Sequence, residues 1–129
     1  MSNNVTLLVA RILLSVMFIM SGLQKLTDIA GTAGYIGSVG LPAATLGAWV
    51  AGIGETLAGI AVLVGFQTRI GAAFLALFCI FTAIFFHADF GDQMQMIMSM
   101  KNFTIAGGLL ALYAAGPESL SVDGRRAAA

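Results

Sequence analysis

The stretch "AGIGETLAGIAVLVG", residues 51–65, carries a single glutamate, Glu55, in an apolar and glycine-rich run. A carboxylate without a partner is costly in a low-dielectric surrounding, so we expect this side chain to face protein and not lipid. The run is long and apolar enough to belong to a membrane-spanning helix. The surroundings of Glu55 therefore depend on which helix face carries it and on which groups lie opposite.

The rest of the chain has the same apolar character. Of its 129 residues, 59% are apolar and only 9% are charged, and the mean hydropathy is +0.96. A soluble domain has about 25% charged residues, so this chain cannot cover a globular surface with polar side chains. A formal net charge of zero argues against nucleic acid as a partner. The one cysteine, Cys79, excludes an intramolecular disulfide.

Four apolar runs predict membrane-spanning helices. Each has about the 20 residues that a helix needs to cross the hydrocarbon region at about 1.5 Å per residue. The runs cover approximately residues 5–23, 45–65, 70–87 and 97–115. The predicted fold class is therefore all-α, a four-transmembrane-helix bundle formed by one integral membrane domain over residues 1–129.

The connections between the runs differ in length. The segment "GFQTR" (65–69) predicts a tight hairpin between the second and third spans. The longer first connection has a helix-start signal at Asp28 and a stop signal at Gly40, shortly before Pro42. We therefore expect a short interfacial helix that caps the bundle between the first and second spans. Residues 116–129 are expected to form a cytoplasmic tail.

The basic residues predict the orientation in the membrane. An even number of spans places both termini on one side, and that side carries Arg69, Arg125 and Arg126. The other side carries Lys25 and Lys101, which are offset by nearby aspartates. We expect a bacterial inner membrane protein with both termini cytoplasmic. The opening segment "MSNNVTLL" lacks the positive charge of a signal peptide, so we expect it to be retained.

Helical periodicity predicts which residues share a face. One stripe on the first span consists of Arg11, Ser15, Phe18, Gly22 and Lys25. One on the second span consists of Ala48, Gly52, Glu55, Gly59 and Val62, and such small residues let another helix approach closely. From the estimated depths of the side chains we predict an Arg11–Glu55 pair. It is either a clamp that fixes the helix register or part of a functional site.

Polar residues also gather at the opposite end of the predicted bundle. His87 closes the third span, Lys101 and Asn102 open the fourth, and Lys25 ends the first. Taken singly, the lysines can extend to the interface and the histidine can cap a helix. Together they predict a polar vestibule, in which His87 could exchange a proton near neutral pH.

Two further patterns allow a functional or a structural interpretation. Phe78, Phe81 and Phe85 recur at helical spacing and could flank a flat quinone-like ring, or could simply pack or face lipid. Methionines alternate in "MQMIMSM", and with His87 they offer the ligand types that suit Cu(I); they are Met94, Met96, Met98 and Met100. Alternate residues of a helix point to different sides, so we favour adaptable packing and predict no metal site.

Several short motifs, in this order, resemble the DoxX family of small four-helix membrane proteins. They are Arg11 followed by "MSGLQKL" (20–26), "VGLP" (39–42), "GETLAGIAVLVGFQTRIGA" (54–72), "MKNFTIAGGLLAL" (100–112) and "GPESLSVDGR" (116–125). The resemblance covers nearly the whole chain, and His87 falls where the family often ends its third helix. Glu55 is thereby one of an ordered set of motifs.

The resemblance implies a role near membrane redox chemistry. Family members include subunits related to those of thiosulfate:quinone oxidoreductase, and others associate with redox and detoxifying enzymes. We therefore expect an accessory or quinone-linked subunit whose partner is a membrane or peripheral oxidoreductase. A non-catalytic scaffold or assembly subunit is an alternative. A small-molecule transporter is another and would require a homo-oligomer, because four helices enclose little space.

Overall fold

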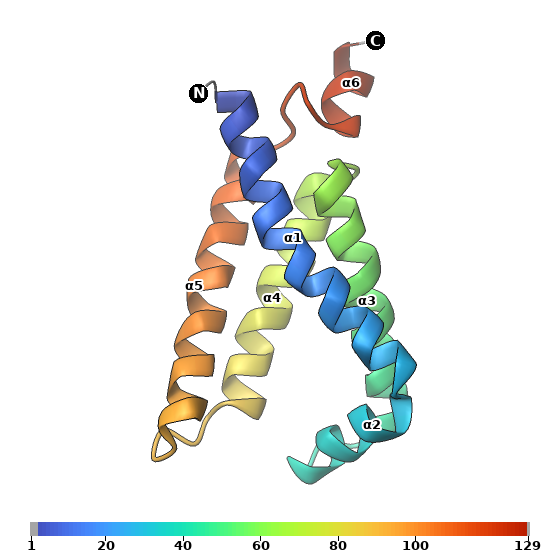
Figure 1. The fold of residues 1–129 in the computed structure, drawn as a ribbon, viewed down its shortest axis with the longest axis vertical. Coiled ribbons are helices and arrows are strands. Elements are labelled where there is room, and N and C mark those ends of the chain that lie inside the picture. Colours follow the sequence, from blue (N-terminus) through green and yellow to red (C-terminus); the bar gives the residue numbers. More distant parts are fainter. Residues whose placement is uncertain (1–2, 129) are drawn as a thin grey trace.

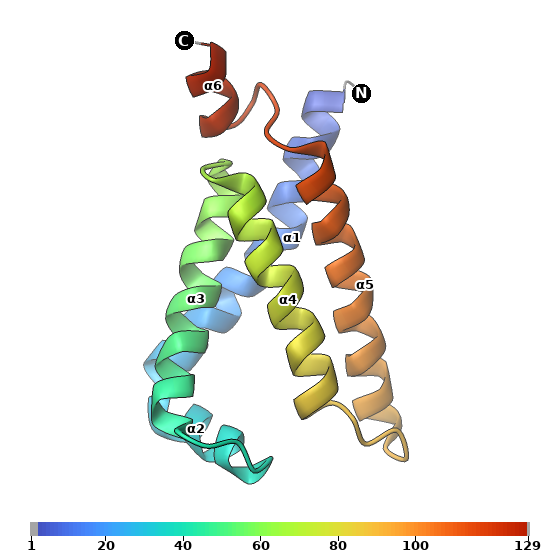
Figure 2. The same ribbon diagram turned by 180° about the vertical axis from the view of Figure 1, so that it is seen from behind.

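The computed structural model describes residues 3–128, which form six helices and contain no strand. The long helices α1 (Asn3–Thr27), α3 (Ala44–Val64), α4 (Thr68–Phe86) and α5 (Gln93–Ala115) run alternately in opposite directions (Figure 1). The short helix α2 (Ile29–Ser38) lies across one end of this bundle. The last helix, α6 (Val122–Ala128), lies at the opposite end, together with both ends of the chain (Figure 2).

Three of the helices, α1, α3 and α4, are long and apolar enough to cross a membrane. The fourth predicted span corresponds to α5, whose 23 residues pack alongside α4. It is not among these three, and its first half contains the polar residues Gln93, Gln95, Lys101 and Asn102. The predicted all-α membrane bundle is confirmed.

The helices α1 and α3 pack on each other along the two predicted stripes. The buried residues of α1 are Arg11, Ser15, Phe18 and Gly22, and α3 buries Ala48, Gly52, Glu55, Thr56, Gly59 and Val62. A Cβ atom added at Gly22 would lie 2.7 Å from the backbone nitrogen of Thr56 and 2.9 Å from the carbonyl oxygen of Gly52. The two backbones are therefore in direct contact, as small residues permit in lipid.

The predicted connections are also found. Asp28 caps α2 by accepting a hydrogen bond of 3.0 Å from the Gly31 backbone N–H, and the chain turns at Gly40 with a φ of 84°. After α3, Gly65 adopts a left-handed conformation with a φ of 75°. Its N–H donates to the carbonyl of Ala61, which ends α3 and begins the short turn into α4.

The core lies between all four long helices. It joins Phe18 of α1 and Val62 of α3 to a cluster from α4 and α5 that consists of Ala72, Leu75, Ala76, Cys79, Ala106, Leu109 and Leu112. Outside this core, large apolar side chains face outward; Leu13 is 72% exposed and Leu77 is 69% exposed. Such a surface suits acyl chains, and the protein is embedded in the lipid bilayer. Toward α2, the α1–α3 pair and the α4–α5 pair diverge (Figures 1 and 2).

The contact at Gly22 predicts that Gly22→Ala weakens the α1–α3 interface. The added methyl group meets backbone atoms of Gly52 and Thr56 that cannot rotate away, so we expect a loss of about 1–3 kcal/mol in the free energy of unfolding. The matched control is Gly107→Ala on α5, where an added Cβ has no neighbour within 4 Å. Thermal unfolding in mild detergent measures both, and an equal loss in the two variants would contradict the close contact.

Candidate functional site

A cavity of about 780 Å³ lies where the two helix pairs diverge. Its volume is in the range of small-molecule sites, roughly 300–1,000 Å³. The phenylalanine and tyrosine side chains that line it are Phe18, Tyr35, Phe74, Phe78, Phe81 and Phe86. Its main polar side chains are Ser21, Lys25, Glu55, Thr82, His87 and Asn102. The lining thus combines an apolar, aromatic surface with a few polar groups, as is typical of small-molecule sites.

One wall of the cavity carries an ion pair between α1 and α3. The Lys25 Nζ atom lies 2.6 Å from Glu55 Oε2, and the side chain of Glu55 is only 4% exposed. Lys25 Nζ also donates to Ser21 Oγ at 2.7 Å, and Ser21 Oγ donates to Glu55 Oε1 at 3.3 Å. The ammonium group therefore directs two of its three hydrogens at protein atoms. The Lys25 side chain is 27% exposed and lines the cavity.

The other wall carries polar groups of α4 and α5. Asn102 Nδ2 donates to Thr82 Oγ1 at 2.9 Å, and Thr82 Oγ1 donates to the carbonyl of Cys79 at 3.1 Å. His87 follows the end of α4, and its Nδ1 lies 3.3 Å from Gln95 Oε1. The structure thus places Lys25, His87 and Asn102 around one cavity, together with Glu55.

Lys101 lies apart from these groups. Its side chain is exposed and is not part of the cavity lining. Neighbouring residues of a helix point about 100° apart, and here Asn102 faces the cavity whereas Lys101 points away from it. Of the predicted methionines, Met94, Met96 and Met100 likewise lie outside the lining, and only Met98 contributes to it.

The predicted Arg11–Glu55 pair is wrong, because each residue has another partner. Glu55 pairs with Lys25, and Arg11 pairs with Glu118. The register of the antiparallel helices explains the difference: Gly22 meets Thr56, while Arg11 lies against Gly65. On α3, the position opposite Arg11 is Gly65, which lies about ten residues, or roughly 15 Å, further along the helix than Glu55.

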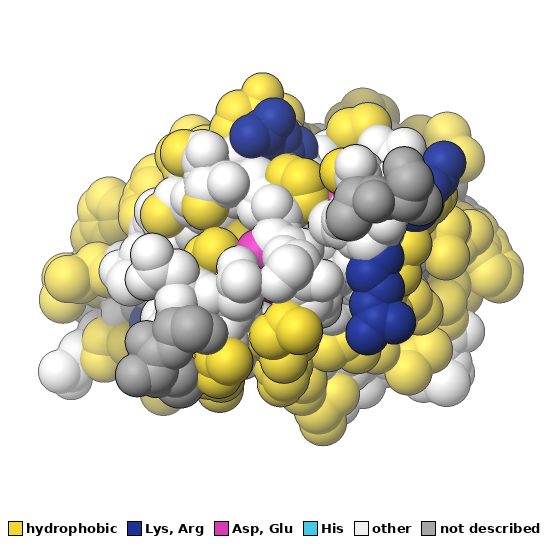
Figure 3. Space-filling view, turned by 90° about the horizontal axis from the view of Figure 1, so that it is seen from above, with side chains coloured by type: hydrophobic (Ala, Val, Ile, Leu, Met, Phe, Trp, Pro, Cys, Tyr) yellow, Lys and Arg dark blue, Asp and Glu magenta, His cyan; other side chains and the backbone are white. Residues whose placement is uncertain are grey.

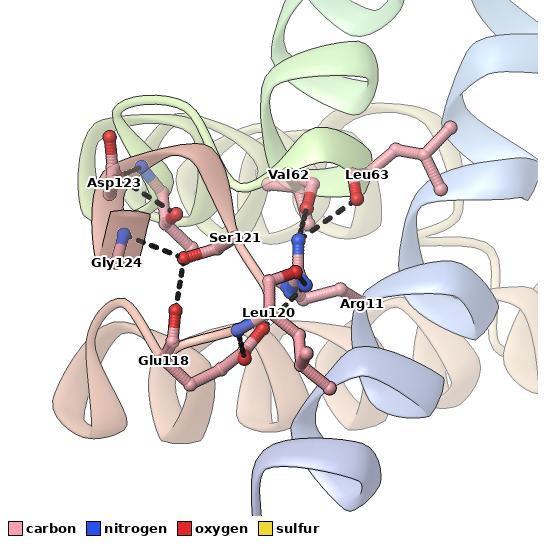
Figure 4. A network of polar contacts seen from close by, with 9 residues as sticks. Arg11, Val62, Leu63, Glu118, Leu120, Ser121, Asp123 and Gly124 are labelled. Atoms are coloured by element: carbon pink, nitrogen blue, oxygen red, sulfur yellow. Dashed lines mark hydrogen bonds and ion pairs between the residues drawn. The ribbon is translucent and has the colours of Figure 1, made fainter. Parts of the chain in front are cut away.

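Arg11 lies at the far end of α1, in a separate polar network (Figure 4). Its guanidinium group is 1% exposed, and one nitrogen donates to the carbonyl of Leu63 at 2.9 Å. The other nitrogen lies 2.5 Å from Glu118 Oε1 and donates to the carbonyl of Leu120 at 2.8 Å. Arg11 thus joins α1 to the end of α3 and to the segment that follows α5.

A second acidic side chain fixes the same segment. The Asp123 carboxylate accepts hydrogen bonds from the backbone N–H groups of Gln67 at 2.9 Å and Thr68 at 2.8 Å, and from the Thr68 hydroxyl at 3.0 Å. Although partial burial acts to raise the pKa of Asp123, these hydrogen bonds hold that pKa below its ordinary value. The Asp123 N–H also donates to the Gly65 carbonyl at 2.8 Å. Residues 118–124 are therefore folded onto the α3–α4 turn.

Sequence reasoning missed Glu118 because residues 116–129 were assigned to a tail. A signal was present in the motif "GPESLSVDGR", since Gly116 and Pro117 end a helix and two acidic residues follow. Ser121 closes the turn that holds them: its hydroxyl donates to the Glu118 carbonyl and accepts from the Gly124 N–H. The spacing of polar residues indicated a compact turn, although no pattern in it pointed to Arg11.

The DoxX family model matches residues 6–88, which is well over half of the chain and covers α1 to α4. The chain belongs to the DoxX family. It is 42% identical over 121 residues to the inner membrane protein YqjF of Escherichia coli strain K12, covering 94% of this chain and 92% of that protein. It is 36% identical over 126 residues to the inner membrane protein YphA of the same organism, covering 94% and 90% respectively. No solved structure matches the chain.

These matches locate the two polar sites of this DoxX protein relative to the family region. Lys25, Glu55 and His87 lie within the matched residues, whereas Asn102 and Glu118 follow them. The relatives are inner membrane proteins. This DoxX chain has three helices long and apolar enough to span such a membrane.

The Arg11 network predicts strong coupling between Arg11 and Glu118. Arg11→Met leaves a buried carboxylate without its partner, and Glu118→Gln leaves a buried guanidinium group with a weaker one, so each should cost about 3–5 kcal/mol of stability. The double variant should lose clearly less than the sum. Thermal unfolding in mild detergent is measured for the wild type, the two single variants and the double variant. If the two single losses of stability add up to the loss in the double variant, the pair does not interact.

Proposed function

We propose that this DoxX-family protein is a membrane subunit that binds a quinone-type ring and serves a membrane redox system as an accessory component. The observation that carries the proposal is the Lys25–Glu55–Ser21 group on the wall of an otherwise apolar, aromatic cavity. A cavity with this lining favours a flat apolar molecule with polar atoms at its edge. Quinones have this character.

The lining also supports a division of roles among the residues. The Lys25 ammonium group can donate its third hydrogen to a ring carbonyl, and Glu55 is a group that can accept or return a proton. Their opposite charges cancel, so the site suits a neutral ligand. Aromatic side chains such as Phe78 and Phe81 supply flat apolar surface. We assign electron transfer to an oxidoreductase partner.

The proposal includes the orientation of the protein in the membrane. Arg69, Arg125 and Arg126 are exposed, whereas Glu118 and Asp123 engage protein atoms. The end of the molecule that carries both termini accordingly presents basic side chains and little negative charge (Figure 3). Positive charge favours the cytoplasmic side, so we propose that both termini are cytoplasmic. The cavity then lies toward the opposite face of the membrane.

A reporter fused after Ala129 tests this orientation. We expect a C-terminal green fluorescent protein to be bright and a C-terminal alkaline phosphatase to be inactive in cells, because the first matures in the cytoplasm and the second outside it. The reverse pattern would place the termini outside and overturn the orientation.

The Arg11 network supports a second candidate function, that of a scaffold. Arg11, Glu118 and Asp123 tie three segments together without lining the cavity. A protein with only this role would present its loops to partners and leave the cavity without a ligand of defined chemistry. The two candidates therefore differ in whether a stoichiometric ligand is recovered from the membrane.

Native mass spectrometry of the protein, extracted from its membrane in mild detergent, tests the proposal. We expect one quinone for each wild-type chain. The Lys25→Met/Glu55→Gln double variant should lose it, because both side chains that hydrogen-bond the ring are removed. The double variant is preferred because it leaves no buried charge without a partner. The control Lys101→Met removes an exposed lysine outside the cavity and should keep the quinone. Absence of quinone from the wild type, or equal retention in both variants, would contradict the proposal and favour the scaffold.

A further inference from the structure

We infer that the cavity recognises its ring at two ends, with one hydrogen-bonding group on each helix pair, and that it accepts both the oxidised and the reduced form. This inference rests on the proposed function and names the ligand class more closely. The class is a flat ring with an oxygen atom at each of two opposite ends. The assigned groups are Lys25–Glu55 on α1 and α3, and Asn102–Thr82 on α4 and α5.

The first end offers a donor and an acceptor side by side. Two hydrogens of the Lys25 ammonium group point to Ser21 and Glu55, which leaves one for a carbonyl oxygen of the ligand. The carboxylate of Glu55 has lone pairs beyond those used by Lys25 and Ser21, so it can accept a hydrogen bond from a ligand hydroxyl. This end can thus bind a ring oxygen in either state.

The second end has the same property through one amide. Asn102 uses one hydrogen of Nδ2 to bond Thr82 Oγ1. Among the residues that the structure describes, its second amide hydrogen and its Oδ1 atom have no hydrogen-bonding partner. Thr82 donates its own hydrogen to the Cys79 carbonyl, so it holds the Asn102 amide in a fixed orientation. Asn102 can therefore donate to a carbonyl or accept from a hydroxyl.

The positions of the two ends follow from the fold. The α1–α3 pair and the α4–α5 pair each pack closely, and they diverge around the cavity that both polar groups line. A ligand that contacts Lys25 and Asn102 together therefore bridges the two pairs. Reduction of a quinone adds two electrons and two protons and converts both carbonyls to hydroxyls. Because each end serves both states, we expect the site to hold either form with similar affinity.

Three probes of similar shape test recognition at two ends: 1,4-naphthoquinone with two carbonyls, 1-tetralone with one and naphthalene with none. Affinities are measured by titration of the protein in nanodiscs, in a Cys79→Ala background that removes the only thiol. Each hydrogen bond should contribute about three- to ten-fold in affinity. We expect the quinone to bind about three- to ten-fold tighter than the tetralone, and naphthalene-1,4-diol to bind within about three-fold of the quinone, a difference smaller than one hydrogen bond supplies.

Variants on α4 and α5 locate the second end. Asn102→Leu should reduce quinone affinity to that of the tetralone and leave naphthalene binding unchanged. Thr82→Val, which releases the Asn102 amide, should act in the same direction by a smaller factor. The control Thr104→Val changes an exposed hydroxyl of α5 that bonds the Met100 carbonyl and lies outside the cavity lining, so all affinities should stay as in the wild type.

The outcomes separate this inference from the proposed function. If quinone and tetralone bind equally well to the wild type, recognition at two ends is wrong while quinone binding stands. If the quinone binds much more tightly than the diol, at least one end does not serve both states and that part of the inference is wrong. If Asn102→Leu lowers the affinity for all three probes by the same factor, Asn102 has only a packing role and the inference is overturned. If no probe binds the wild type, the proposed function itself fails.

Discussion

The close contact between α1 and α3 is the constraint on which the other features depend. Gly22, Gly52 and Gly59 let the two backbones meet, and this sets the antiparallel register of the helices. Once the register is fixed, Lys25 lies beside Glu55 and Arg11 lies beside the α3–α4 turn. Both basic residues of α1 are thereby removed from lipid. The cavity and the folded C-terminal segment both rest on this pair of helices.

Much of the fold could be predicted because it depends on local pattern. The apolar runs, the cap at Asp28 and the turn at Gly65 are properties of short segments, and the structure contains each of them. The buried faces of α1 and α3 follow from helical periodicity alone. The ends of the helices differ from the predicted spans by a few residues, since an apolar run does not show how far a helix continues past the hydrocarbon region.

The side-chain pairs could not be predicted to the same degree, because they depend on distance between helices. Arg11 and Glu55 were the only charges near the middle of the first two spans, yet a shift along the helix axis separates them. The true partner of Arg11, Glu118, is 107 residues away in sequence. In contrast, Lys25, His87 and Asn102 were expected at one end of the bundle, where helix direction alone determines proximity, and they line one cavity.

The partner of Arg11 also has a consequence for biogenesis. The first helix is synthesised well before its partners, because Glu118 and Leu120 follow Arg11 by 107 and 109 residues. Until those residues are made, the guanidinium group must therefore rely on water, lipid headgroups or the insertion machinery. Arg11 gains the Glu118 carboxylate and the Leu120 carbonyl only after residues 118–120 have been made, so completion of this network depends on the folding of that segment onto the α3–α4 turn.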